Sequence, residues 1–249
     1  MNKQIKIGIV GGCAISQKNI PLKSRFYSIL SEKIKTNLSH QTVFSFSTYS
    51  DYSSLSTKCY EVSNKSHLDF MVIHLRPQPF YIISKLFIKY ENELNDDMGI
   101  CINPLLYGRT WSNHLKGDPV PTFNYYSVKP RFMDLNIFLG NIFRLHTKAS
   151  IYIYNQIMHI QSYCQLNHIK LIILGIPYQP FSKIGNLNCK KLNLSLMEKL
   201  SNDKNIENFE CYTRMESNSY FEKDNLHLSI NGHYTLGSIL FEGIKPILV

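Results

Sequence analysis

The chain lacks the cysteine pairs, the long apolar runs and the basic clusters that mark several large classes of protein. Its six cysteines are widely spaced and none belongs to a C-x-x-C pair, which argues against a zinc site and against a disulfide framework. No apolar run is long enough to span a bilayer, and the N-terminal residues show no signal-type apolar core with a cleavage site. We therefore expect a cytoplasmic protein with reduced thiols, no membrane span, no metal and no cofactor.

Positive charge is in excess but is not concentrated. The chain has 27 Lys and Arg against 18 Asp and Glu, a net charge of +9, and its longest basic cluster is only Lys190-Lys191. A nucleic-acid-binding surface shows a basic stripe interleaved with aromatic residues, and the sequence contains none. We interpret the charge as an aid to solubility and expect no nucleic-acid partner.

The pattern of apolar residues predicts alternating strands and helices. Near-continuous apolar runs predict strands at residues 5–10, 42–46, 68–75 and 170–177, with a weaker one at 208–212. Helical spacing predicts helices over 26–34, within 132–165 and over 232–240. Because 249 residues with 44% hydrophobic content are enough for a full core, we expect one domain over 1–249. Its fold class is α/β, with three layers around a mostly parallel sheet and sites beyond the carboxyl ends of the strands.

A loop-rich stretch at about 91–130 interrupts this pattern. It is rich in Gly, Pro, Asn and Asp and contains the single tryptophan, Trp111. A long irregular segment in a compact domain is usually a lid or a binding loop, and a disordered insertion is the alternative. Trp111 is a candidate substrate contact, although aromatic residues in loops more often serve local packing.

The pair Asp224 and His227 is the most informative feature of the chain. An acid three residues before a histidine lies on the same side of a single turn, where it orients the imidazole and stabilises its charged form. This pair forms half of a catalytic triad, whereas a lone histidine is more often structural. His233, which follows in Asn231-Gly232-His233, is expected to serve packing or capping of the closing helix.

The N-terminal part of the chain offers a nucleophile for this pair. The apolar run over 5–10 is followed by Gly11, Gly12 and Cys13, a pattern typical of a buried strand that ends in a tight turn, with Cys13 at the start of the next helix. A thiol at a helix N-terminus near an imidazole is a stronger nucleophile than an ordinary thiol. The alternatives are that Cys13 is a small buried residue and that Ser16, one helical turn later, is the nucleophile.

These residues resemble the SGNH, or GDSL-type, hydrolase superfamily, a three-layer, flavodoxin-like fold of esterases, lipases, thioesterases and carbohydrate deacetylases. The family's last block, Asp-x-x-His followed by Gly-His, corresponds to residues 224–233. Its first block, Gly-Asp-Ser, corresponds to Gly11-Gly12-Cys13, so cysteine replaces the serine nucleophile. The resemblance implies a triad of Cys13, His227 and Asp224.

The family's third block, Gly-x-Asn-Asp, corresponds to the Arg-Pro-Gln-Pro segment at 76–79. Gln78 falls on the asparagine that donates to the oxyanion, and a glutamine offers the same amide on a longer stem. The resemblance therefore implies an oxyanion hole made by Gln78 and the backbone amide of Cys13. The second-block glycine has no counterpart between Thr48 and Ser54, so that donor is not identified.

Two polar residues end the predicted strand over 68–75. Arg76 is either paired structurally or directed at the substrate, and we count it with Gly12 among the expected substrate contacts. His74 lies within the strand and is expected to be a core histidine that is hydrogen-bonded to its neighbours.

The resemblance implies an acyl-ester or thioester hydrolase, or an acyltransferase, that works through a covalent acyl-enzyme. The expected partner is a small acylated molecule, such as an acylated sugar, an acyl-coenzyme A or a carrier-bound acyl group, and the basic surface suits an acidic carrier. The alternative is a catalytically degenerate member that binds a carbohydrate or a protein partner. A nucleotide-binding protein is a third interpretation, but the Gly-x-Gly-x-x-Gly pattern is not met.

Overall fold

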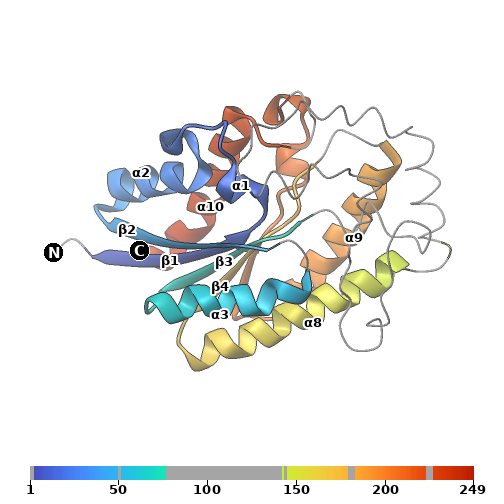
Figure 1. The fold of residues 1–249 in the computed structure, drawn as a ribbon, viewed down its shortest axis with the longest axis horizontal. Helices are drawn as coiled ribbons and strands as arrows, with labels where there is room; N and C mark the ends of the chain where they lie inside the picture. Colours follow the sequence, from blue (N-terminus) through green and yellow to red (C-terminus); the bar gives the residue numbers. More distant parts are fainter. Residues whose placement is uncertain (1–2, 50–51, 77–141, 143–144, 179–182, 223–226) are drawn as a thin grey trace.

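The computed structural model describes residues 3–49, 52–76, 142, 145–178, 183–222 and 227–249. Within these residues a five-stranded sheet has the order β2-β1-β3-β4-β5, and every neighbouring pair is parallel. The strands are β1 (Gln4–Gly11), β2 (Gln41–Thr48), β3 (Phe70–His74), β4 (Lys170–Leu174) and β5 (Ile206–Phe209). Helices cover both faces of the sheet (Figure 1). This is the three-layer α/β fold that the sequence predicted.

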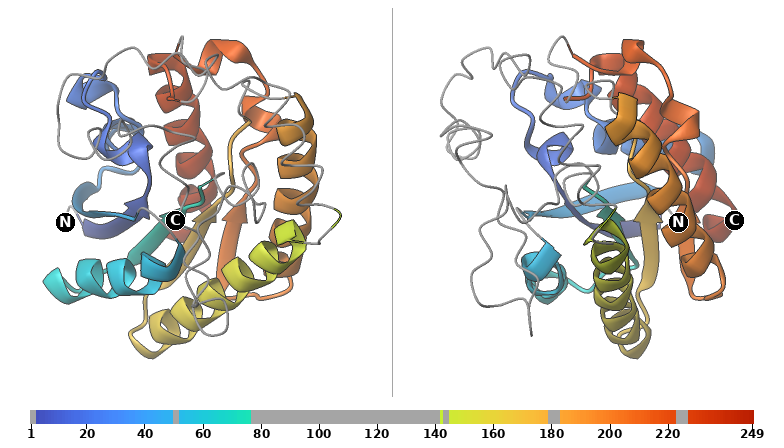
Figure 2. Two further views of the ribbon diagram at one scale, coloured as in Figure 1. Left: turned by 45° about the vertical axis from the view of Figure 1, so that its right-hand side comes forward. Right: turned by 90° about the vertical axis from the view of Figure 1, so that its right-hand side faces the viewer.

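Helices α2 (Phe26–Leu38) and α10 (Ile230–Leu248) pack together on one face of the sheet (Figure 2). The buried apolar residues of α2 form the stripe at helical spacing that the sequence predicted, and they include Phe26, Ile29, Leu30 and Ile34. α10 extends the predicted helix at both ends. Alternate residues of β1 and β3 join this layer, because successive side chains of a strand point to opposite faces.

Helices α3 (Leu55–Lys65), α8 (Leu145–Leu166) and α9 (Lys183–Ser201) cover the other face. The sequence did not predict α3 or α9. In α3 the apolar stripe is only Leu55, Cys59 and Val62, set among Ser, Thr, Asn and Lys, and so narrow a stripe gives a weak signal. Among the residues that the structure describes, no helix is long and apolar enough to cross a membrane.

The central strands bring the candidate site segments together. The parallel register pairs Val10 with Ile73 and His74 with Leu174, so β1, β3 and β4 end at nearly the same level. Their following loops therefore start at one edge of the sheet, where sites form in this class of fold. β2 lies at an edge of the sheet, and none of its residues is buried.

The fifth strand differs from its predicted position, because β5 runs from Ile206 to Phe209 instead of over 208–212. The Glu210 carboxylate accepts hydrogen bonds from the backbone N–H groups of Tyr212 and Thr213 at the start of the 3-10 turn η5 (Thr213–Met215). Such local bonds compete with a β ladder and end the strand. The predicted loop at 91–130 lies outside the described residues, as does most of the helix predicted before Leu145.

Candidate active site

Cys13 begins α1 (Cys13–Ser16) directly after β1, as the sequence predicted. The two glycines before it allow the chain to pass closely over the end of β3. A Cβ atom on Gly11 would lie 3.1 Å from the Cβ of His74, and one on Gly12 would lie 3.1 Å from the Nε of Arg76. Both distances are tighter than ordinary contacts, so a larger residue at either position would require its neighbour on the end of β3 to shift.

Cys13 differs in exposure from the other described cysteines. It is partly exposed, whereas Cys59, Cys164, Cys189 and Cys211 are buried. Burial raises the pKa of Cys164 to about 12 and that of Cys59 well above its ordinary value. A thiolate is the reactive form of a cysteine, so these buried thiols are unreactive at neutral pH. Ser16, the alternative nucleophile, is exposed at the end of α1.

The backbone on either side of His227 is fixed by a short antiparallel contact. Leu228 forms a bridge with Phe221, and the N–H of Glu222 donates to the carbonyl of His227 at 2.7 Å. The N–H of Ser229 donates to the carbonyl of Tyr220 at 2.9 Å. Asp224 lies outside the described residues, so its orientation toward His227 stays a prediction.

The first turn of α10 explains the glycine of the predicted Gly-His block. Ser229 caps the helix, because its Oγ accepts from the N–H of Gly232 at 3.2 Å and donates to the carbonyl of Ser219 at 2.8 Å. A Cβ atom on Gly232 would lie 2.1 Å from the carbonyl oxygen of Tyr220. The residue must therefore be glycine for the helix to approach the chain that leads to His227.

We predict that Gly232→Ala destabilises the protein by about 3 kcal/mol, since the clash is with backbone and not with a flexible side chain. Urea unfolding measures the change. Gly175→Ala is the matched control, because its new Cβ would lie 3.3 Å from the carbonyl oxygen of Phe209, tight but without overlap, and it should cost clearly less than Gly232→Ala. Equal stability of the two variants would contradict the close approach.

A buried side-chain network joins α1 to the chain around His227. The Nε2 of Gln17 donates to the carbonyl of Leu228 at 2.8 Å, and its Oε1 lies 3.3 Å from the Nε2 of His233. The Nδ1 of His233 accepts from the N–H of Phe26 at 3.3 Å. The structure therefore brings the segments of Cys13 and His227 into direct contact through Gln17. Gln17 was not predicted from the sequence, since nothing in a local pattern marks a glutamine as buried.

His233 and His74 are both buried on the α2 and α10 side of the sheet. Burial lowers the pKa of His233 to about 4, with a further contribution from the charge of Arg25. Burial, and then the charge of Arg76, lower the pKa of His74 to about 4. The prediction that His74 is hydrogen-bonded was wrong for the described part of the chain, where neither ring nitrogen has a partner. Both rings are neutral at pH 7.

Arg76 has structural partners and also lies beside the residue before Cys13. Its Nη1 donates to the carbonyl of Tyr49, and its guanidinium lies 5.6 Å from the centroid of the Tyr49 ring. The Tyr52 hydroxyl accepts from the N–H of Arg76 at 2.8 Å and donates to its carbonyl at 2.9 Å. The bond to Tyr49 holds the side chain beside Gly12, and the bonds to Tyr52 hold its backbone, so the positive charge of Arg76 lies near the start of α1.

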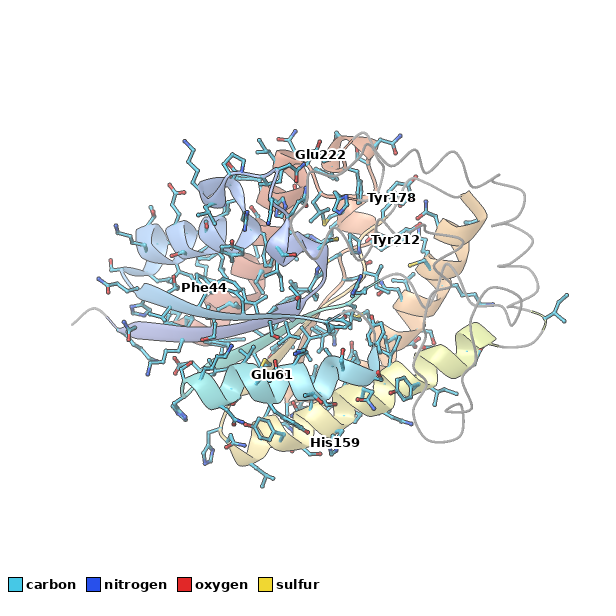
Figure 3. All side chains as sticks on the ribbon, viewed as in Figure 1. Phe44, Glu61, His159, Tyr178, Tyr212 and Glu222 are labelled. Atoms are coloured by element: carbon cyan, nitrogen blue, oxygen red, sulfur yellow. The ribbon has the colours of Figure 1, made fainter. Side chains whose placement is uncertain are left out.

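Aromatic contacts connect Tyr178, which follows β4, to the chain that leads to His227. The Tyr178 ring meets those of Tyr212 and Phe221 edge to face, with centroids 5.6 and 6.3 Å apart. Figure 3 shows Tyr178, Tyr212 and Glu222 near the carboxyl ends of the strands. Since Phe221 pairs with Leu228, these rings support the backbone that carries His227.

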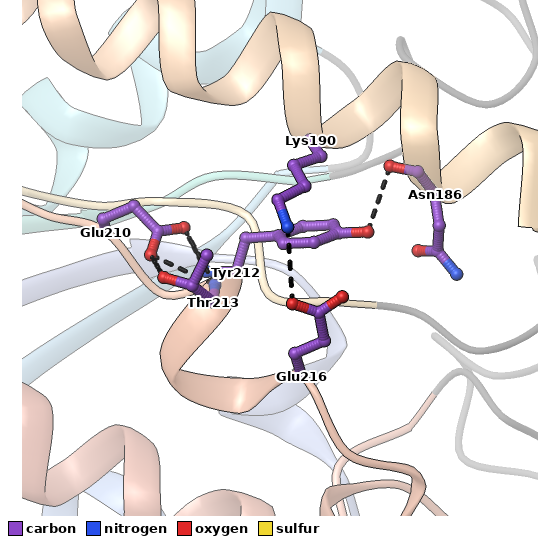
Figure 4. Close-up of polar contacts among 6 residues, drawn as sticks. All are labelled: Asn186, Lys190, Glu210, Tyr212, Thr213 and Glu216. Atoms are coloured by element: carbon purple, nitrogen blue, oxygen red, sulfur yellow. Dashed lines mark hydrogen bonds and ion pairs between the residues drawn. The ribbon is translucent and has the colours of Figure 1, made fainter.

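Tyr212 is also bound to α9 (Figure 4). Its hydroxyl donates to the carbonyl of Asn186 at 3.1 Å, and the Lys190 ammonium lies 5.5 Å from its ring centroid. Lys190 also pairs with Glu216 at 3.4 Å. Together with the turn capped by Glu210, these contacts position the chain between β5 and the site.

Two further predicted site residues belong to the segment that follows β3. Gln78 and Trp111 lie outside the described residues, so their contacts with an oxyanion or a substrate stay predictions. No cluster of three or more His, Cys, Asp or Glu side chains that would hold a metal occurs in the described part of the chain.

Comparisons with known proteins give a clear result for the fold. No protein-family model matches the chain, and no curated protein matches it in sequence. The lipase Lip_vut3 from a goat rumen metagenome matches with a TM-score of 0.60 and 13% identity, over 96% of this chain and 97% of the lipase. The psychrotrophic esterase EstA from Pseudoalteromonas sp. matches with a TM-score of 0.56 and 10% identity, over 98% of each chain.

A member of the lipolytic G-D-S-L family from Veillonella parvula matches with a TM-score of 0.53 and 12% identity, over 97% of this chain and 98% of that one. The matches span nearly whole chains, so the likeness includes the order and connection of the elements. The sheet order and the helices on both faces agree with it. This chain therefore has the fold of the SGNH, or GDSL-type, hydrolases.

Proposed function

We propose that this protein is an SGNH-type acyl hydrolase in which Cys13 is the nucleophile and His227 is the general base. The observation that carries the proposal is the position of Cys13, which is the partly exposed member of the described cysteines and directly follows β1. Gln17, which directly follows α1, donates a hydrogen bond to the carbonyl of Leu228, the residue after His227. Esterases and lipases share the fold, which supports the acyl class of substrate.

The first half-reaction transfers the acyl group to the enzyme. His227 takes the thiol proton, and the Cys13 sulfur attacks the carbonyl carbon. The new C–S bond forms as the bond to the leaving oxygen or sulfur breaks, and the leaving group receives the proton from His227. In this scheme Asp224 orients His227, while Gln78 and the backbone N–H of Cys13 donate to the oxyanion.

The second half-reaction releases the acyl group. His227 takes a proton from water, the water oxygen attacks the thioester carbonyl, and the C–S bond breaks to return the Cys13 sulfur, which regains the proton. An acceptor alcohol in place of water would make the same enzyme an acyltransferase. Because a thioester intermediate forms readily from another thioester, an acyl-coenzyme A or a carrier-bound acyl group is a favoured donor, with an acylated sugar as the alternative.

Positive charge near the site supports an anionic donor. The Arg76 guanidinium lies against Gly12, and the chain carries a net charge of +9. Coenzyme A and acyl carriers both present phosphate groups, which arginine binds well. On this basis we propose Arg76 and Gly12 as substrate contacts, and we keep Trp111 as a proposed contact for the acyl or sugar part of the substrate.

Brief reaction with 4-nitrophenyl acetate, or separately with acetyl-coenzyme A, should leave an acetyl group on the peptide that contains Cys13. Acid quenching, proteolysis and mass spectrometry locate the adduct. His227→Ala should reduce the amount formed at early times, whereas Ser16→Ala should leave it unchanged.

An acetyl group on Ser16 would instead identify the alternative nucleophile. If no adduct and no turnover are found with esters or thioesters, the catalytic proposal fails. The protein is then better described as a binding module that has retained the hydrolase fold.

A further inference from the structure

We propose that Gln17 is a positioning residue, which keeps the segment that carries His227 against the turn that carries Cys13. The proposal rests on the assignment of these two residues as base and nucleophile. Gln17 directly follows α1 and is only 6% exposed. A buried glutamine needs partners for its amide, because an unpaired buried polar group is costly.

Both ends of the Gln17 amide are used, and they join elements that are distant in sequence. The Nε2 donates to the carbonyl of Leu228 at 2.8 Å, and the Oε1 lies 3.3 Å from the Nε2 of His233. Leu228 directly follows His227, and His233 is in the first turn of α10. One side chain thus fixes α1 to the residue beside the proposed base.

The orientation of the amide is determined by its surroundings. The Nδ1 of His233 accepts from the N–H of Phe26, so the proton of the neutral ring is on Nε2, which must donate to the Oε1 of Gln17. The amide nitrogen is then left to donate to the carbonyl of Leu228. A flipped amide would place donor against donor and acceptor against acceptor. An amide is the side-chain group that satisfies both partners at once.

The hydrogen bond from Gln17 to Leu228 differs from the other contacts of the His227 segment. Glu222 and Phe221 hold the segment through backbone contacts within the same part of the chain, while α1 itself is a single turn. The bond from Gln17 crosses from one segment to the other. Since a nucleophile and its base must lie within hydrogen-bond reach, a displacement of about 1 Å costs roughly a hundredfold in rate.

A double-mutant cycle tests the proposal. Gln17→Met keeps the volume of the side chain but removes both hydrogen bonds. We would measure the rate of Cys13 alkylation by iodoacetamide between about pH 5 and 9, together with kcat/KM for 4-nitrophenyl acetate. We expect Gln17→Met to lower both rates roughly 10- to 100-fold and to change the pH profile toward that of His227→Ala. Added to His227→Ala, it should have no further effect.

The outcomes separate this inference from the proposed function. If His227→Ala slows both reactions but Gln17→Met leaves them unchanged, or if the two effects simply multiply, the positioning role is overturned while the proposed function stands. If His227→Ala changes neither rate, the proposed function fails and the inference with it. Asp69→Ala is the matched control, because it removes the carboxylate that accepts from the N–H of Lys6 at 2.7 Å near the start of β1 and β3. It should lower stability without changing the pH profile.

Discussion

Cys13→Ala should lower the turnover of an activated acyl ester or thioester by about a thousandfold or more, because no other described cysteine can replace it. Cys59, Cys164, Cys189 and Cys211 are buried, and a rate that remains would come from substrate binding and oxyanion donors alone. Steady-state kinetics with 4-nitrophenyl acetate measures the loss. Binding of a non-reactive substrate analogue should be nearly unchanged, since the substitution removes a single sulfur atom.

Cys13→Ser is the informative companion variant. It introduces the oxygen nucleophile that the SGNH family uses into the proposed site, where the native nucleophile would be a larger and more acidic sulfur. We expect activity well below that of the parent but above that of Cys13→Ala, with the acyl group now on an oxygen. Full activity in Cys13→Ala, together with loss of activity in Ser16→Ala, would identify Ser16 as the nucleophile.

Acidification from about pH 6.5 to 4 should destabilise the fold by about 3 kcal/mol for each of His74 and His233. Both pKa values are lowered to about 4 in the folded protein, while an unfolded histidine titrates near 6.5. The unfolded state therefore binds more protons in this window, and stability is lost as the pH falls. The two together, about 6 kcal/mol, are comparable to the low end of the stability of a typical domain, so the protein should unfold at much lower urea concentrations near pH 4 than at pH 7. Urea unfolding at a series of pH values measures the slope.

His74→Leu should separate this effect from general acid denaturation. The ring nitrogens of His74 have no partner among the described residues, so the variant should be at least as stable as the parent at pH 7 and should show about half of its pH slope. His67→Gln, at an exposed histidine, should retain the slope of the parent. A parent protein whose stability is constant from about pH 6.5 to 4.5 would contradict the neutral, buried state of both rings.

The sequence predicted those parts of the fold whose signal is local. β1, β3 and β4 are buried on both faces in the centre of the sheet, so each shows as a continuous apolar run. α3 was missed because its stripe is narrow, and β5 was misplaced because the Glu210 carboxylate caps the turn that follows it. These features depend on side-chain contacts and not on periodicity.

The position of Cys13 in the fold was predictable from the sequence, but the contacts of the surrounding residues were not. Gly11, Gly12 and Cys13 stand where the pattern predicted, at the end of β1. Gln17 was not predicted, since its two partners, Leu228 and His233, are more than two hundred residues away along the chain. Such a contact forms only in the assembled fold, so the pattern of neighbouring residues does not predict it.

The same sequence separation has a consequence for folding during synthesis. While the ribosome has yet to make α10, the sheet face that α2 and α10 share is covered only in part, and the amide of Gln17 has no partner at Leu228 or His233. Contacts between distant parts of a chain form late and fold slowly. The proposed site should therefore assemble only after α10 has left the ribosome, and the apolar residues that α10 covers stay exposed until then.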